Sequence, residues 1–372
     1  MRRILYKHWP YLPTGLSLAA LLIIFWFFDQ TYLGANAGRV TQILENPILT
    51  FGLIIFGAYT GAFISGEFSV KIPLNFAPLV MAVVGGFLAG VGAVIAGMST
   101  NSVVLFNLAG VFTLSAFMIT TGWIYVAFMI LGGFAGARLF VWAISKIPAV
   151  KRTIPVPGVL ASKSNQRITF FALLIILVIS VFVVLLLPQL NISTKLGLIT
   201  AVLLLMLFGF VVERGTICMS SMLKEWFISR SAYVWRSVLF TIMFLALLYQ
   251  TGLQLHLYES IVVEDYVQSP GFLILGSFLM GFGFIFADGC FIGSLWKAGE
   301  GNVINVIGIF GLLGGIGTAQ LVKTIFLKKM TEHSSLISNH LTTILNPVVF
   351  LIILWLLGLL LLIVLKRKRY RY

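Results

Sequence analysis

Long apolar segments recur along the whole chain and are separated by shorter polar segments. Each apolar segment is close to the roughly 20 residues that an α-helix needs to cross a bilayer. The pattern predicts about ten transmembrane helices, at 12–28, 48–66, 78–97, 122–144, 169–187, 196–213, 235–256, 271–287, 303–323 and 346–366. A further apolar stretch, 103–120, is expected to dip into the membrane without crossing it. The predicted fold class is therefore an all-α polytopic membrane protein.

Composition and charge agree with this prediction. Of the 372 residues, 60% are hydrophobic and only 10% are charged, whereas soluble proteins carry about 25% charged residues. The net charge of +14 gathers at 1–7, 146–167 and 366–371. Basic clusters that flank apolar helices are typical of cytoplasmic loops, so we expect cytoplasmic N- and C-termini and no nucleic-acid partner. The first apolar run lacks a small-residue cleavage site and is expected to remain as a helix.

Motifs of the first half recur in the second half in the same order. GGFLAGVGAVIAG (85–97) resembles GSFLMGFGFIFADG (276–289), and LGGFAGARL (131–139) resembles LGGIGTAQL (313–321). Glycine-rich helices can resemble each other by composition alone, but the shared order favours an internal repeat.

The repeat predicts the domain organisation. We expect one transmembrane repeat at 1–187, which includes a cytoplasmic basic loop at 145–168, and a second repeat at 188–372. Each repeat would contain about five helices. After an odd number of crossings the chain lies on the opposite side of the membrane, so the second repeat would have the inverted orientation. Such inverted repeats are frequent in transporters.

Both cysteines lie in polar, glycine-containing segments beside predicted helices: ERGTICMSSMLKEW (213–226) and ADGCFIGSLWKAGEGN (287–302). Interrupted helices at membrane depth are tolerated where they line a cavity or are buried in protein. In transporters, such broken helices point their N-termini at anions. The two segments therefore predict re-entrant broken-helix hairpins that line a substrate pathway.

The residue types in these segments favour a sulfur-containing anion as substrate. A thiol is a soft, polarizable group and a weak hydrogen-bond donor, and intramembrane cations are costly enough to indicate function. In the first repeat, Met98 falls at the position that corresponds to Cys290. The predicted pathway residues are Cys290, Cys218, Met98, Lys297, Arg214, Gly289, Gly293, Gly299, Glu300 and Gly301.

Each of these residues also has a purely structural explanation. A free cysteine is often a small buried hydrophobe, and Arg214, like Lys224, fits a plain positive-inside anchor. Lys297 and Glu300 fit an ordinary cytoplasmic loop, and the glycines fit close helix packing. The sequence alone leaves both explanations open.

Familiar enzymatic and cofactor motifs are missing from the sequence. The four histidines lack metal-ligand spacing, and no Walker motif, nucleophile elbow or HExxH motif occurs. We therefore expect no metal, no cofactor and no enzymatic activity.

The two cysteine segments resemble motifs of one known family. GCFIGSLWKAGEGN (289–302) is similar to the G-C-x-x-G-x-x-x-x-A-G-E-G signature of YeeE/YedE-type membrane proteins, the family of bacterial thiosulfate transporters. RGTICMSSMLKEW (214–226) is similar to that family's R-G-x-x-C-x-x-S/G-x-x-R/K-D/E element. The resemblance implies uptake of thiosulfate, or of a related sulfur or selenium species, across the bacterial inner membrane. It also implies that Cys218 and Cys290 touch the ion through S–H···S contacts.

The chain departs from the family pattern at two positions. Met98 stands where family members commonly carry a third cysteine, so a soft sulfur is kept and its donor proton is lost. Asp288 replaces the glycine that usually precedes Gly-Cys, and its negative charge disfavours a dianion.

The resulting expectation is an inner-membrane transporter whose partners are the lipid bilayer and a small sulfur-containing anion, with thiosulfate as the first candidate. One alternative substrate is a selenium compound or another sulfur species. Another alternative is a membrane thiol–disulfide or sulfur-transfer enzyme, whose two sulfurs would have to approach to about 2 Å in one state. A third is a membrane partner that recruits a cytoplasmic sulfur-carrier protein through the basic loop.

Overall fold

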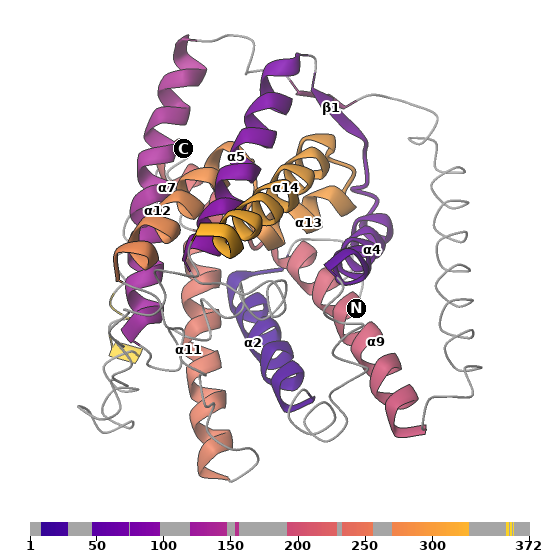
Figure 1. Ribbon diagram of the computed structural model, residues 1–372. Coiled ribbons are helices and arrows are strands. Elements are labelled where there is room, and N and C mark those ends of the chain that lie inside the picture. The colour runs from indigo at the N-terminus through magenta and orange to yellow at the C-terminus, as the bar shows by residue number, and fades with distance from the viewer. Residues whose placement is uncertain are drawn as a thin grey trace.

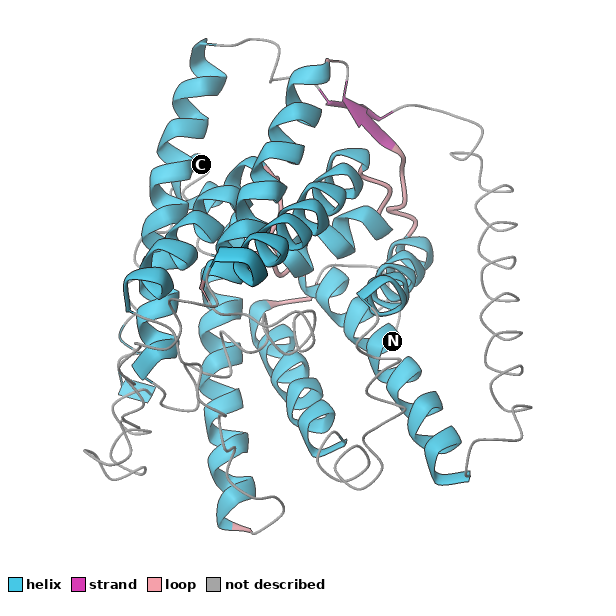
Figure 2. Ribbon diagram, in the orientation of Figure 1, coloured by secondary structure: helices cyan, strands magenta, loops and turns pink. Residues whose placement is uncertain are grey.

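The computed structural model describes the chain at residues 9–28, 47–73, 75–96, 120–146, 153–155, 192–228, 233–255 and 270–326, and at positions 355, 356, 358 and 360. Within these residues the fold is helical apart from a short two-stranded sheet (Figures 1 and 2). The helices are α2 (Tyr11–Phe28), α4 (Pro47–Ser65), α5 (Phe76–Ile95), α7 (Thr120–Lys146), α9 (Ile192–Gly215), α10 (Met219–Ile228), α11 (Tyr233–Gln254), α12 (Pro270–Phe286), α13 (Phe291–Gly299) and α14 (Val303–Phe326). The strands are β1 (Lys71–Pro73) and β2 (Thr153–Pro155).

The apolar pattern places the helices well. Helices α2, α4, α5, α7, α9, α11, α12 and α14 lie where the sequence predicts membrane-crossing segments. Among the described residues, 5 helical spans are long and apolar enough to cross a membrane, and two of these, 199–224 and 271–299, run through an interruption. The predicted helix at 169–187, and almost all of the stretches 103–120 and 346–366, lie outside the described residues.

Glycines allow four of the long helices to pack closely. Helix α5 packs against α14 and α12, and α12 packs in turn against α7. An added Cβ at Gly90 would collide with the carbonyl of Leu312 on α14, and one at Gly281 would collide with the carbonyl of Met129 on α7. Without a hydrophobic driving force between helices in lipid, such close backbone approach supplies the packing energy.

A second group of helices packs in the same manner. Helix α4 lies against α9, where Gly57 faces the carbonyl of Met206, and α2 lies against α11. The short helices α10 and α13 connect the two groups, because α13 packs against α4, α9 and α14, while α10 packs against α7, α11 and α12. Figure 1 shows α13 lying between α14 and α4.

Strand β1 and the residues before it form hydrogen bonds with the loop that follows α13. Strands β1 and β2 pair antiparallel with Ile72 opposite Ile154. The amide of Lys71 also donates to the carbonyl of Gly301 at 3.0 Å, and the amide of Ser69 donates to the carbonyl of Glu300 at 3.1 Å. The segment after α4 therefore holds the loop that contains the AGEG part of the cysteine motif.

Replacing Gly281 by alanine tests the close packing of α12 on α7. The added methyl group would meet the Met129 carbonyl, so we expect a loss of about 1–3 kcal/mol of stability, as for other overpacked sites. The matched control is Gly314→Ala on α14, because an added Cβ at Gly314 meets nothing within 4 Å. Thermal unfolding of the two detergent-solubilised variants would measure the difference, and equal unfolding temperatures would contradict the packing.

Candidate functional site

Both cysteines lie at interruptions between a long helix and a short one. Cys218 is the last residue before α10 in the segment that follows α9, and Cys290 is the N-cap of α13 in the segment that follows α12. The Cys290 sulfur accepts a hydrogen bond from the amide of Gly293 at 3.2 Å. The predicted broken helices are thus present at both cysteine motifs, with the thiols at the N-terminal ends of the short helices.

Each interruption contains a residue in the left-handed backbone region. Thr216 has φ 50° and Asp288 has φ 58°, and each lies two positions before a cysteine. Non-glycine residues rarely adopt this conformation, and a β-branched threonine does so least readily. Such strain persists only where the surrounding structure imposes it, often at functional sites.

The two interruptions are tied directly to each other. The amide of Met219, at the start of α10, donates to the Cys290 sulfur at 3.3 Å. In the other direction, the indole Nε1 of Trp296 on α13 donates to the carbonyl of Ile217 at 2.9 Å. One sulfur atom therefore receives amide donors from the first turns of two different helices.

The two thiols meet at Gly293. Cys218 is 0% exposed and Cys290 is 3% exposed, and both are free thiols. An added Cβ on Gly293 would overlap the Cys218 sulfur and lie 3.2 Å from the Cys290 sulfur. Because Gly293 has no side chain, both sulfur atoms can lie next to its Cα.

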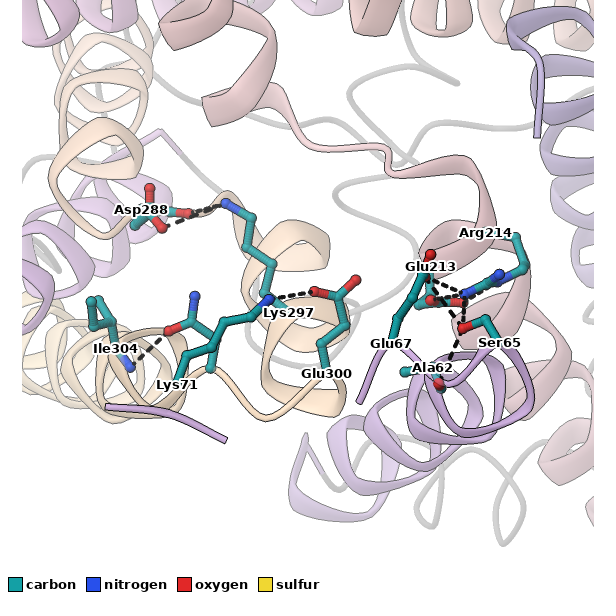
Figure 3. A network of polar contacts seen from close by, with 11 residues as sticks. Ala62, Ser65, Glu67, Lys71, Glu213, Arg214, Asp288, Lys297, Glu300 and Ile304 are labelled. Atoms are coloured by element: carbon teal, nitrogen blue, oxygen red, sulfur yellow. Dashed lines mark hydrogen bonds and ion pairs between the residues drawn. The ribbon is translucent and has the colours of Figure 1, made fainter. Parts of the chain in front are cut away.

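A cluster of three charged side chains lies beside Cys290. The Asp288 carboxylate accepts from Lys224 Nζ of α10 at 2.7 Å and lies 3.6 Å from Lys297 Nζ of α13 (Figure 3 shows the Lys297 side). Lys297 Nζ also donates to the Asp288 carbonyl at 2.6 Å, and Lys224 Nζ lies 4.2 Å from the centre of the Phe140 ring. The cluster holds two cations and one anion.

Arg214 belongs to a different cluster. Its Nε donates to Glu213 Oε2 at 2.6 Å, and its Nη2 donates to Ser65 Oγ at 2.8 Å and Glu67 Oε2 at 3.0 Å (Figure 3). A further, very close contact joins Nη2 to the other Glu213 oxygen. Arg214 and Glu213 are both 0% exposed. Two carboxylates thus surround this guanidinium and tie α9 to the end of α4.

Glu300 lies between these two clusters in Figure 3. Its carboxylate is 3.7 Å from Lys71 Nζ. Burial raises the pKa of the Glu300 carboxyl above its ordinary value, while the ammonium groups of Lys71 and Lys297 act against this rise. The adjacent glycines are required by close contacts: Gly299 packs against α4 at Ala58, and Gly301 has φ +95° against the Ser69 carbonyl.

Two buried polar atoms near the interruptions lack a hydrogen-bond partner among the described residues. They are Ser220 Oγ on α10 and Asn305 Oδ1 on α14. The amide nitrogen of Asn305 donates to the Asp288 carbonyl at 3.2 Å, and an added Cβ on Gly289 would lie 2.9 Å from that nitrogen. Unpartnered buried polar atoms are rare in native proteins and call for a specific explanation.

The structure brings only some of the sequence-predicted pathway residues together. It brings Cys218, Cys290 and Gly293 together, and it places Lys297 beside them through Asp288. Arg214 lies in the separate carboxylate cluster, and Met98 lies outside the described residues. On sequence grounds Lys224 had only an anchoring role, and no pattern in the sequence pointed to Lys224 or Asn305 as members of the site.

Comparisons with known proteins agree with the motif resemblance. A family described as "Sulphur transport" matches residues 214–372, which begin at the arginine of the first cysteine motif and include both motifs. The chain is 28% identical over 256 residues to "Probable transporter YedE" of Salmonella typhimurium (strain LT2), covering 68% of this chain and 60% of that protein. It is 25% identical over 271 residues to the "Probable transporter YedE" of Escherichia coli (strain K12), covering 71% of this chain and 64% of that protein.

These matches confirm the resemblance to the YeeE/YedE family that the two cysteine motifs predict. The matched part of the chain spans less than two thirds of the length of either curated relative, at 60% and 64%.

A double-mutant cycle tests the contact between Gly293 and the thiols. Gly293→Ala inserts a methyl group into the space of the Cys218 sulfur, and we expect it to cost about 1–3 kcal/mol of stability by overpacking. Combining it with Cys218→Ala removes the overlapping sulfur, so the double variant should be more stable than the two single effects predict. Denaturant unfolding in detergent would measure the coupling, and additive effects would exclude the contact.

A second cycle tests whether Arg214 balances a buried carboxylate. Arg214→Leu leaves Glu213 buried without its guanidinium partner, which should cost about 3–5 kcal/mol. Arg214→Leu combined with Glu213→Leu removes both buried charges and should recover much of that loss. Thermal unfolding of the single and double variants is the measurement. A double variant that is less stable than Arg214→Leu alone would contradict the pairing.

Proposed function

Starting from a chain that resembles the YeeE/YedE family in both cysteine motifs, we propose that this protein transports a small sulfur-containing anion, with thiosulfate as the first candidate. The observation that carries the proposal is the meeting of the two thiols at the first turns of α10 and α13. The family name "Sulphur transport" and the name of the two relatives support transport rather than catalysis.

The surroundings of the thiols favour an anion. Helix N-termini carry partial positive charge and unpaired amides, and they are ready-made anion-binding sites. Here amides from two such termini point at one sulfur atom. The thiol protons would then be the groups that contact the soft sulfur of a passing anion, as S–H···S hydrogen bonds.

The lysines of the neighbouring cluster would attract the ion. Lys297 and Lys224 carry one more positive charge than Asp288 balances. Glu300 and Gly301 position the end of α13 against β1, while Gly289, Gly293 and Gly299 permit the close contacts of the hairpin. We assign Arg214 a positioning role, because it is enclosed by the carboxylates of Glu213 and Glu67.

The proposed architecture is a pair of inverted repeats of five spans, 1–187 and 188–372, in the bacterial inner membrane with both termini cytoplasmic. The packing of the helices supports it. In the proposed repeat α5 corresponds to α12 and α7 to α14, so the contact of α5 with α14 corresponds to that of α12 with α7. In the same way α2 corresponds to α9 and α4 to α11, so the contact of α4 with α9 corresponds to that of α11 with α2. The corresponding motif helices α5 and α12 also run antiparallel, with Gly85 near Gly283 and Gly92 near Gly276. In this arrangement Met98 would supply a soft contact from the first repeat.

The second candidate function is thiol–disulfide or sulfur-transfer chemistry, which the closeness of Cys218 and Cys290 favours. Such an enzyme would cycle between free thiols and a disulfide or persulfide. A transporter would keep both thiols reduced during turnover. Intact mass measured after alkylation, with and without prior reduction, separates the two functions in protein taken from cells that are consuming the substrate.

Cys290→Ala tests the proposed pathway. In a bacterium without other sulfate and thiosulfate uptake, the wild type should support growth on thiosulfate. Cys290→Ala removes the sulfur that accepts amide hydrogen bonds from two helices. It should therefore reduce uptake at least about tenfold, which corresponds to about 1.4 kcal/mol. Cys218→Ala should also impair uptake.

Ser277→Ala is the matched control, since Ser277 is buried and its hydroxyl bonds only to carbonyls of its own helix α12 in the described contacts. Normal uptake by a membrane-inserted Cys290→Ala variant would remove the thiol mechanism. No uptake of thiosulfate by the wild type would point to another sulfur or selenium species.

A further inference from the structure

The cation pair beside the thiols already holds an anion that belongs to the protein. Lys224 from α10 and Lys297 from α13 converge on the carboxylate of Asp288, with Nζ–Oδ distances of 2.7 and 3.6 Å. Each lysine comes from one of the two short helices that carry a cysteine at their N-terminal end. A small oxyanion placed between the two ammonium groups would occupy the same position as the Asp288 carboxylate.

The carboxylate is the most accessible member of this cluster. The Asp288 side chain is 38% exposed, whereas those of Lys224 and Lys297 are 11% and 16% exposed. Its backbone is fixed independently of the carboxylate, because Lys297 Nζ and Asn305 Nδ2 both donate to the Asp288 carbonyl. The carboxylate can therefore leave the lysines by a side-chain rotation while the interruption before Cys290 keeps its shape.

We propose that Lys224 and Lys297 form an anion-binding step next to the thiols, and that the Asp288 carboxylate competes with the transported ion for it. This inference rests on the proposed function, and it names Asp288 as the residue that sets the preferred charge of the substrate. The Asp288 carboxylate then lowers uptake of doubly charged sulfur anions such as thiosulfate relative to singly charged ones.

The charge balance of the cluster gives the physical reason. Two ammonium groups and one carboxylate leave one positive charge, which a monoanion neutralises while the displaced Asp288 carboxylate stays close by on its fixed backbone. A dianion leaves excess negative charge beside the carboxylate. Interactions between unit charges a few ångström apart reach several kcal/mol at the effective dielectric of a partly buried site, so the penalty falls mainly on the dianion.

The test compares two ions of nearly equal shape that differ in charge. Thiosulfate is a dianion, and methanethiosulfonate replaces one of its charged oxygens by a methyl group and is a monoanion. Initial uptake rates of both, labelled with sulfur-35, are measured in proteoliposomes that contain the full chain. Asp288→Asn should raise the ratio of thiosulfate to methanethiosulfonate uptake about tenfold or more, because one like charge beside the bound ion is removed.

Two further variants make the result specific. Asp288→Gly removes the same charge and suits the left-handed backbone at φ 58°, so it replaces Asp288→Asn if that variant does not assemble. Glu67→Gln removes a carboxylate from the Arg214 cluster instead, and it should leave the uptake ratio unchanged. Lys224→Gln should reduce uptake of both ions, since it removes half of the cation pair.

The outcomes distinguish the two levels of proposal. If the wild type takes up sulfur anions and neither Asp288 variant changes the ratio, the competing role of Asp288 is wrong while the transport function stands. If Glu67→Gln changes the ratio as much as Asp288→Asn, the effect is one of overall charge and the assignment to Asp288 fails. If the wild type takes up neither ion, thiosulfate is excluded as the substrate and this inference is wrong as well.

Discussion

The hydrogen bonds that one broken helix receives from the other are the constraint on which the rest of this structure depends. Ending a helix inside an apolar environment exposes amide and carbonyl groups that no water is available to satisfy. Here the groups freed at one interruption are bonded by residues of the other: Met219 N–H by the Cys290 sulfur, and the Ile217 carbonyl by the Trp296 indole. The interruption at Cys218 therefore depends on the segment at Cys290, and the contacts that satisfy its backbone also bring the two thiols together.

These contacts between the two interruptions need rigid surroundings that hold the segments in place. The long helices supply it through backbone-to-backbone contacts at glycines, such as Gly281 against Met129 and Gly86 against Gly308. Thr216 and Asp288 adopt left-handed backbone conformations in the turns that join the long helices to the short ones, and the surrounding packing keeps them there. The packing energy of the scaffold therefore maintains the positions of the two short helices, and these in turn determine which side chains meet.

The sequence predicted the features that depend on local patterns along the chain, namely the positions of helices and of their interruptions. Apolar run length located the described long helices, and the polar, glycine-containing segments at 213–226 and 287–302 located both interruptions. Pairings between distant segments were not accessible in this way. Nothing in the sequence indicates that Ser65 and Glu67 from the first half enclose Arg214, or that Lys224 rather than Arg214 joins Lys297. These contacts depend on how α4, α9 and α10 cross, which charge and hydropathy patterns do not encode.

The distribution of charge decides which cations can serve an anion. Arg214 is fully buried and is balanced by Glu213 and Glu67, so a substrate bound there would have to compete with two carboxylates in a site of low exposure. Breaking such a pair leaves a buried charge uncompensated, at high cost. Lys224 and Lys297 share one carboxylate that is partly exposed, and this carboxylate belongs to Asp288, two residues before Cys290. Within the described part of the chain, excess positive charge and soft sulfur thus coincide at the lysine pair and not at Arg214, and for this reason we propose the lysine pair as the place where a sulfur anion binds.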